Sequence, residues 1–263
     1  TGSGTRKTLA VLQRELPGLV IHEVPSGARA FDWTVPNEWT IRDAKLIGPD
    51  GDVIVDYANS NLHVMGYSTP VDLEISLEDL QEHLHSIPEQ PDAIPFVTSY
   101  YHPTWGLCLA DRVRRELKQG TYRVVIDSDL EPGSLSYGEL ILPGESSDEI
   151  FLSTYVCHPS MANNELSGPM VATGLARWLM QVPNRHYTYR IVFTPESIGA
   201  IVYASRNLTI LKDNVIAGFQ LTCIGDDRAY TYLASRKGNT RIDRVAKRVL
   251  SNRPNVRHYS YLG

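Results

Sequence analysis

The sequence predicts an α/β domain, with a mostly parallel sheet covered by helices, that is interrupted early by a β-rich insertion. After Pro143, strand-like apolar runs alternate with helix-like amphipathic runs, and the connectors between them are short. Such alternation is typical of parallel sheets covered by helices. Between residues 33 and 135, short strands and turn residues dominate instead. We therefore expect the α/β domain to start at 1–32, the β-rich insertion to span 33–135, and the α/β domain to resume over 136–263.

Leucines recur with helical spacing over Arg6–Leu16, and the Pro17-Gly18 pair ends this predicted helix. Leu19–Val24 then has the apolar content of a strand. In the insertion, a Pro49-Asp50-Gly51 turn lies between two apolar runs and indicates a β-hairpin. The strands of this hairpin are expected at Ala44–Ile47 and Val53–Asp56.

Two short helices and two more strands complete the elements up to residue 142. Ser76-Leu77-Glu78-Asp79 resembles a capping box, which indicates a helix that begins there and reaches about His85. Gly120 marks the end of the second helix. The second helix is expected at Asp111–Lys118, and the strands at Tyr122–Ser128 and Tyr137–Leu142.

The second half of the chain repeats one pattern, a strand followed by a helix. Pro169 lies in the first turn of one such helix, where its missing N–H leaves no hydrogen bond unmade. The predicted strands are Ile150–Val156, Tyr189–Phe193 and Val215–Cys223. The predicted helices are Pro169–Met180, Ile198–Asn207 and Asn239–Leu250.

Composition limits the partners and the location expected for this chain. The net charge is −5 and no basic block stands out, which argues against nucleic acid as a partner of this segment. No apolar stretch approaches the roughly 20 residues that span a bilayer. Cys108, Cys157 and Cys223 are far apart in apolar surroundings. They are expected to be reduced, buried thiols of a cytoplasmic protein, and not a disulfide framework or a cysteine-based zinc site.

The most informative segment is Leu152–Gly168. In it an apolar run ends at Cys157-His158-Pro159, and a polar turn, Asn163-Asn164-Glu165, leads into a helix. Imidazole is the commonest metal ligand in proteins, and an Asn or Glu side chain in the turn could complete its coordination. A single histidine is as often structural, so the residues alone leave both interpretations of His158 open.

Two further strand-to-helix junctions carry acidic residues. Glu196 follows the strand Tyr189–Phe193, and Asp226 and Asp227 follow the strand Val215–Cys223. With His158, they are expected at the carboxyl edge of the sheet, where open α/β folds keep their sites. The alternative for Glu196 is a helix cap. The alternative for the two aspartates is a solvated turn that pairs with Arg228.

These residues resemble the bacterial aminopeptidase-like domain family, whose domain-of-unknown-function proteins are related to the two-zinc aminopeptidases. The resemblance covers the segments Leu152–Gly168, Pro195–Gly199, Leu221–Arg228, Gly2–Lys7, Phe31–Pro36 and Glu89–Tyr101. It implies a zinc-aminopeptidase-like α/β domain, here incomplete, with an inserted β-rich domain. The chain has no initial methionine, and a strand is expected to begin at Tyr259–Gly263. The resemblance therefore implies a missing C-terminal part with the last strands, a further metal-binding histidine and a winged-helix domain.

Residue by residue, the resemblance retains only part of a two-zinc site. His158 matches a metal-binding histidine, and Glu196 matches the general base. Neutral residues stand at the other ligand positions, Ser160, Asn164, Ser197 and Thr222. Because an amide carries no charge to offset the repulsion between two dications, the resemblance implies one zinc ion. Its ligands would be His158, the missing histidine and one oxygen, for which Asn164 is a candidate. Glu165 or Asp226 would replace a lost carboxylate or contact the substrate.

The function implied by this resemblance is zinc-dependent hydrolysis of peptide or related amide bonds, with Glu196 as the catalytic base. The alternative is a non-catalytic peptide- or glycan-binding protein on a former aminopeptidase scaffold. The expected partner is a peptide or small amide substrate, without nucleic acid or membrane. The sequence leaves open whether the chain forms a homo-oligomer.

Overall fold

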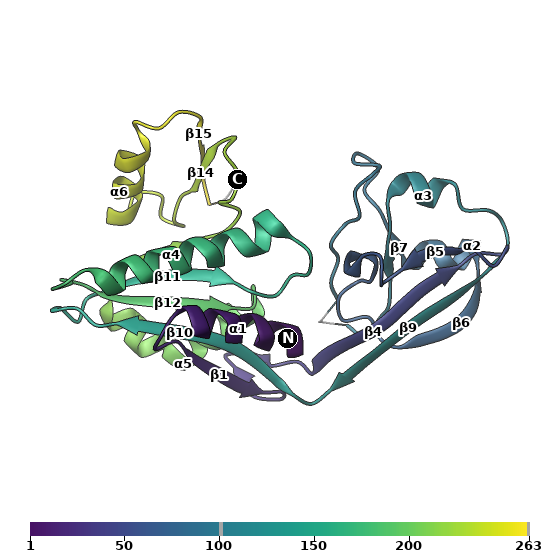
Figure 1. Cartoon of the computed structure of the whole chain (residues 1–263), viewed down its shortest axis with the longest axis horizontal. Coiled ribbons are helices and arrows are strands. Elements are labelled where there is room, and N and C mark those ends of the chain that lie inside the picture. The colour runs from purple at the N-terminus through teal and green to yellow at the C-terminus, as the bar shows by residue number, and fades with distance from the viewer. Residues whose placement is uncertain (100–101, 262–263) are drawn as a thin grey trace.

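The computed structural model describes residues 1–99 and 102–261 and shows two lobes with a smaller C-terminal unit (Figure 1). The central sheet of the larger lobe has five strands in the order β1-β10-β12-β11-β13. Their bounds are Val20–Pro25 for β1, Ser134–Leu142 for β10, Glu149–Tyr155 for β11, Thr188–Thr194 for β12 and Val215–Gln220 for β13. The predicted strand Tyr137–Leu142 therefore lies in this sheet.

The central sheet is mixed, so the prediction of a mostly parallel sheet is not confirmed. β11 pairs in parallel with β12 and β13. In contrast, β10 pairs antiparallel with both β1 and β12. The difference follows from the connections, because parallel neighbours need a crossover. Helices link β11, β12 and β13, whereas β10 arrives from the insertion without a crossover helix.

Three helices cover the two faces of the central sheet (Figure 1). They are α1 at Ser3–Glu15, α4 at Ser167–Gln181 and α5 at Ile198–Asn214. Leu9 of α1 and Ala176 of α4 are buried in one core with Phe193 of β12. Val202 of α5 is buried in a second core, against Val192. Because neighbouring strand residues point to opposite faces, α1 and α4 lie on one face and α5 on the other.

The β-rich lobe is built on an antiparallel sheet in the order β5-β4-β9-β6. These strands are Glu38–Ile47 (β4), Val53–Asp56 (β5), Val71–Ser76 (β6) and Thr121–Glu131 (β9). Tyr122, Val124 and Ile126 of β9 alternate into its core. The predicted hairpin is confirmed as β4 and β5. The limits of the inserted domain, 33–135, stay a prediction.

Short elements cover this β-rich core. They are α2 (Leu77–Leu80), β7 (Leu84–His85), β8 (Leu107–Cys108) and α3 (Asp111–Arg115). The Ser76 side chain accepts a hydrogen bond from the Asp79 N–H at 3.1 Å, so the predicted cap is confirmed. The helix was expected to reach about His85, but its α-helical part ends at Leu80 and a 3₁₀ turn follows. Leu84 is buried and begins a strand there.

The two lobes are joined at Glu38, the first residue of β4. Its carboxylate accepts two hydrogen bonds from Arg6 of α1, at 2.5 and 2.9 Å. The Ser134 N–H at the start of β10 donates to the same carboxylate at 3.1 Å. Glu38 therefore connects α1, the insertion and the central sheet at the base of the β-rich lobe.

The remaining described elements are short strands and one amphipathic helix. They are β2 (Arg29–Ala30), β3 (Trp33–Thr34), β14 (Tyr230–Leu233), α6 (Arg241–Leu250) and β15 (Val256–Tyr259). Tyr100, Tyr101, Leu262 and Gly263, which the sequence predictions included, lie outside the described residues. Within the described ranges, none of the helices combines the length and the apolar composition that a membrane span requires.

Candidate functional site

Three strand-to-helix junctions carry the candidate site residues to one edge of the central sheet. β11 and β12 end side by side, with Tyr155 opposite Thr194. Each of the three junctions also contains a non-glycine residue in the left-handed region. These residues are Ser160 (φ 53°), Ser197 (φ 55°) and Cys223 (φ 50°). Such backbone is uncommon and clusters at functional sites, so the turns themselves mark this edge.

Glycines let the helices begin directly at this edge. A Cβ atom on Gly168 would overlap the carbonyl oxygen of Leu221, which follows β13. A Cβ atom on Gly199 would overlap the Thr194 hydroxyl at the end of β12. With any larger residue at these two positions, helices α4 and α5 could not begin this close to the strands. Both glycines are therefore needed for the arrangement of the site.

His158 lies between two glutamates that come from different junctions. Its Nδ1 atom is 3.0 Å from Oε2 of Glu165, and its Nε2 atom is 3.2 Å from Oε2 of Glu196. The Glu165 side chain is only 8% exposed, whereas that of Glu196 is 47% exposed. Glu165 is therefore a fixed internal partner of His158, and Glu196 is the carboxylate that an incoming molecule can reach.

The two oxygens of Glu165 have different partners. Oε1 accepts a hydrogen bond from the backbone N–H of Cys157. Oε2 is buried and pairs with Nδ1 of His158 at 3.0 Å. Because a buried ionised carboxylate needs a partner, a metal ion bound here would replace this contact with a coordination bond.

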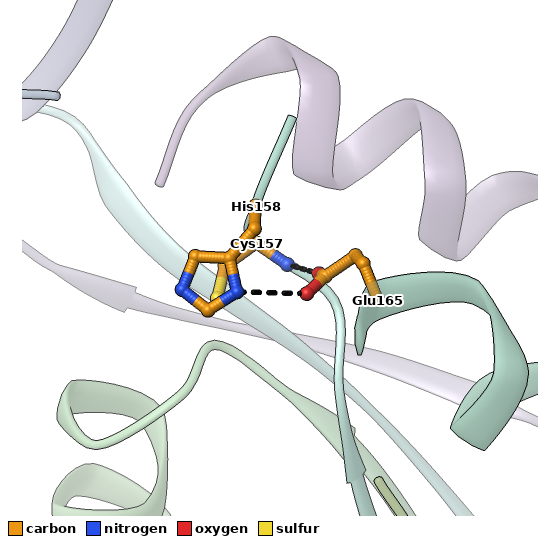
Figure 2. Close-up of side chains that lie close together, drawn as sticks. All are labelled: Cys157, His158 and Glu165. Carbon is orange, nitrogen blue, oxygen red and sulfur yellow. Dashed lines mark hydrogen bonds and ion pairs between the residues drawn. The ribbon is translucent and has the colours of Figure 1, made fainter. Parts of the chain in front are cut away.

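Cys157 completes a cluster of three potential metal ligands. The Cys157 Sγ, a ring nitrogen of His158 and a carboxylate oxygen of Glu165 all lie within 4.8 Å of one another. Figure 2 shows the Glu165 carboxylate facing the His158 ring, with the Cys157 side chain next to that ring. The backbone N–H of Glu196 donates to the Cys157 sulfur at 3.2 Å. The prediction that the three cysteines are buried thiols is wrong for two of them, because Cys157 is half-buried and Cys223 is exposed.

The surroundings of His158 favour positive charge. Burial lowers the pKa of His158, but the neighbouring Cys157 and Glu165 side chains outweigh burial and raise that pKa to about 10. Two aromatic rings also contact the imidazole. Phe96 meets it edge-on at 4.4 Å between ring centroids, and Tyr155 does so at 5.5 Å. The site thus combines converging anions with a packed, oriented histidine.

Of the other predicted site residues, Asn164 contacts His158 and Asp226 does not. Asn164 places its Oδ1 atom 3.1 Å from Nδ1 of His158. Asp226 does not line the cavity of this site. Its carboxylate pairs with Arg228 at 3.0 Å and with Asn163 at 3.2 Å. The Arg228 guanidinium lowers the pKa of Asp226 to about 2.

These donors are of the kinds that bind a metal ion. Three of the four neutral residues that the resemblance places at ligand positions, Ser160, Asn164 and Thr222, have side-chain partners of their own. Ser160 donates to Asn61 at 2.6 Å, and Thr222 bonds to the Tyr155 hydroxyl. Imidazole, thiolate and carboxylate are all zinc ligands. Charge that could hold a second dication is lacking at Asn164, Ser197 and Thr222.

A cavity of about 530 Å³ opens in front of His158 and Glu196. One wall belongs to the larger lobe and the other to the β-rich insertion. The insertion contributes four aromatic side chains, Trp39, Tyr57, Tyr67 and Phe96. Sequence reasoning missed these residues and Cys157. The position of Cys157 next to His158 was a usable signal, but nothing local distinguishes Phe96 from a packing residue.

The sequence profile of the family described as "Domain of unknown function (DUF4910)" matches residues 1–263. A protein of Clostridium acetobutylicum is 45% identical over 250 residues, which cover 95% of this chain and 57% of that protein. It is provisionally named a polysaccharide biosynthesis protein with an aminopeptidase-like domain.

Solved structures are also similar to this chain. A crystal structure from Clostridium acetobutylicum, provisionally called a peptidase, has a TM-score of 0.92 and 43% identity; the match covers 99% of this chain and 61% of that one. BSAP, a zinc aminopeptidase from Bacillus subtilis, has a TM-score of 0.65 at 11% identity, with 97% and 73% covered. The second likeness shows the aminopeptidase-like fold alone. The chain spans less than two thirds of the length of both clostridial relatives.

Proposed function

We propose that this chain, which belongs to the DUF4910 family, carries the centre of a single-metal hydrolase of peptide or related amide bonds. Its scaffold is aminopeptidase-like. One observation carries the proposal. His158, Glu165 and Glu196, from two separate junctions, meet within 3.2 Å contacts at the wall of a cavity. Packing alone does not require two carboxylates on the two nitrogens of one imidazole.

In the proposed reaction, Glu196 moves the protons. A bound zinc ion would supply a Lewis acid that polarises the scissile carbonyl and makes the attacking water more acidic. Glu196 accepts a proton from that water and donates one to the leaving amine. Its carboxylate is half-exposed to the cavity, and its backbone N–H is fixed by Cys157. His158 and Glu165 would hold the ion.

The cavity favours substrates without strong negative charge. Among its lining residues in the described ranges, the charged side chains are Glu165 and Glu196 beside His158, and no Lys or Arg side chain takes part. A phosphate or free carboxylate would therefore meet two carboxylates and no Lys or Arg side chain, while the His158 ring is already paired with both glutamates. Because one relative is provisionally named a polysaccharide biosynthesis protein, an acylated amino sugar belongs beside short peptides among the substrates to be tested.

The alternative function is binding of a peptide or glycan without catalysis. It is favoured by the neutral residues Asn164, Ser197 and Thr222 at former ligand positions and by the aromatic wall of the cavity. Aromatic faces suit sugar rings and apolar side chains alike. In this case His158 would be paired permanently with Glu165 and Glu196.

Metal analysis of the full-length protein separates the two functions. The wild type and His158→Ala would be stripped with a chelator, supplied with zinc and then assayed for bound metal. Hydrolysis of aminoacyl amides and N-acylated amino sugars would be measured on the same samples. We expect one zinc per chain in the wild type, a loss of zinc in His158→Ala, and zinc-dependent hydrolysis. A wild type that stays metal-free, yet binds these compounds unchanged, would establish the alternative.

A further inference from the structure

We propose that Cys157, His158 and Glu165 form a site for one thiophilic divalent ion such as zinc, with the Cys157 thiolate as a ligand. This inference rests on the proposed function only for the presence of a metal and does not depend on hydrolysis. The resemblance to two-zinc aminopeptidases pointed to nitrogen and oxygen ligands. The structure instead places a sulfur atom beside them (Figure 2).

The spacing of the three donors suits a tetrahedral ion. With ligand bonds of about 2.0–2.3 Å, the donor atoms of a tetrahedral zinc site lie roughly 3.3–3.8 Å apart. The three donors here lie within 4.8 Å of one another. Side-chain rotations that bring them about 1 Å closer would surround an ion. Three protein ligands would leave the fourth position open, which is the pattern of catalytic zinc sites.

Glu165 supplies an observation that is independent of the cysteine. Its side chain is more than nine-tenths buried, and Oε2 faces Nδ1 of His158 at 3.0 Å. The other oxygen is held by the Cys157 N–H, so the carboxylate is fixed with Oε2 directed toward the cluster. A buried ionised oxygen needs a cationic partner, and a coordinated dication would supply one when the imidazole is neutral.

The sulfur of Cys157 is held in place beside the other two donors. The Glu196 N–H donates to the sulfur at 3.2 Å, two residues before α5 begins at Ile198. Cysteine binds a metal ion as the thiolate. Cys108 shows the contrast. It is fully buried outside the cluster, and burial raises the pKa of its thiol to about 12.

Charge balance selects both the number and the kind of ion. A thiolate and a carboxylate together neutralise one dication, while the His158 ring stays neutral as a ligand. In a buried site the charges of the ion and of its ligands need to cancel in this way. Calcium and magnesium prefer shells of six or more oxygens. A site with one sulfur and one nitrogen therefore selects zinc, or cobalt as its substitute.

Cobalt spectroscopy on the full-length protein tests the ligand assignment. The metal-free protein would be titrated with Co²⁺, which gives a near-ultraviolet charge-transfer band only when a thiolate is bound. We expect this band at one equivalent of Co²⁺ in the wild type and in Cys223→Ser. Cys223 is a matched control, because its sulfur lies 3.7 Å from Asn164 but outside the cluster. Cys157→Ser should lose the band, and its zinc affinity should fall at least tenfold, since even residues that only support ligands give about 10–100-fold effects.

The outcomes separate this inference from the proposed function. Cobalt binding without a charge-transfer band in the wild type would overturn it, whether or not the variant folds. A band that survives in Cys157→Ser would also overturn it. Zinc-dependent hydrolysis without the band would leave the proposed function standing and remove Cys157 from the site. The band without any hydrolysis would support the site and reject the hydrolase.

Discussion

The Nε2 atom of His158 lies 3.2 Å from Oε2 of Glu196, although the two residues follow different strands. β11 and β12 are parallel neighbours that end in register, so the first polar residues after them must meet. The contact places a half-exposed carboxylate beside the candidate metal ligand. Four predictions follow from this arrangement and from the structure that supports it.

Glu196→Gln removes the proposed base while keeping its shape. We expect the rate constant for hydrolysis to fall about 10²–10⁴-fold, the range for loss of a general acid–base group. Bound zinc should stay at the wild-type level, because Glu196 is not among the three ligands. Glu15→Gln, on the exposed surface of α1, is the control and should retain activity. Equal activity in both variants would remove Glu196 from the mechanism.

Phe96→Ala removes the aromatic ring of the insertion that packs against His158. Phe96 also lines the cavity, where an aromatic contact with a bound substrate would contribute about 0.5–1.5 kcal/mol, so KM should rise roughly two- to tenfold with a smaller change in kcat. Zinc content should not change. Tyr230→Ala, an exposed aromatic position outside the cavity, should leave both constants unaltered. A fall in kcat alone would mean that Phe96 positions His158 and does not contact the substrate.

Arg190 is the buried cation of the central sheet. Its guanidinium pairs with Glu149 at 2.6 Å and with Glu139 at 2.6 Å, and the Arg190 side chain is 3% exposed. Arg190→Ala would leave Glu149 buried without a partner and should lower the free energy of unfolding by about 3–5 kcal/mol. Arg123→Ala, which breaks the exposed pair with Asp72, should cost less than about 1 kcal/mol. Chemical denaturation measures both, and similar losses would contradict the prediction.

Asp243 makes the C-terminal unit sensitive to acid. Its carboxylate accepts hydrogen bonds from Thr240 and Ser235, which hold the pKa of Asp243 well below its usual range. The folded pKa is lower than the unfolded value of about 3.9. The stabilisation is therefore present above about pH 4 and is lost as the pH falls toward the folded pKa.

Asp243→Asn should consequently melt below the wild type at neutral pH, and the difference in Tm should close under acid conditions. Glu89→Gln, at an exposed position, should differ little from the wild type at any pH. Thermal melts from pH 2 to pH 7 would reveal the trend. A difference in Tm that persists unchanged at the acid end would show that the effect is steric.

Local sequence signals predicted much of the fold. Leucine spacing indicated α1, the Ser76 cap indicated α2, and strand–helix alternation indicated the order from β11 to α5. The mixed sheet was not predictable in this way, because the partner of β10 depends on where the chain re-enters from the insertion. Pairing between distant strands leaves no mark in either segment alone.

The candidate site, too, could be predicted from the sequence only in part. His158 and Glu196 could be anticipated because each follows a predicted strand, and parallel strands share their carboxyl edge. Glu165 was expected near the site as a substrate contact, but its burial against His158 depends on the turn between β11 and α4. Phe96 reaches the site from a distant part of the chain, and only the folded structure reveals its position.

The cavity lies between two lobes, and its reactive groups and its facing wall come from different lobes. The proposed metal ligands and base all belong to the larger lobe, whereas the facing aromatic wall belongs to the β-rich insertion. Glu38 fastens the insertion at its base, away from the ligands. Sequence change within the insertion can thus alter which molecule is accepted while the reactive groups are conserved, so related proteins could diversify in substrate without rebuilding their chemistry.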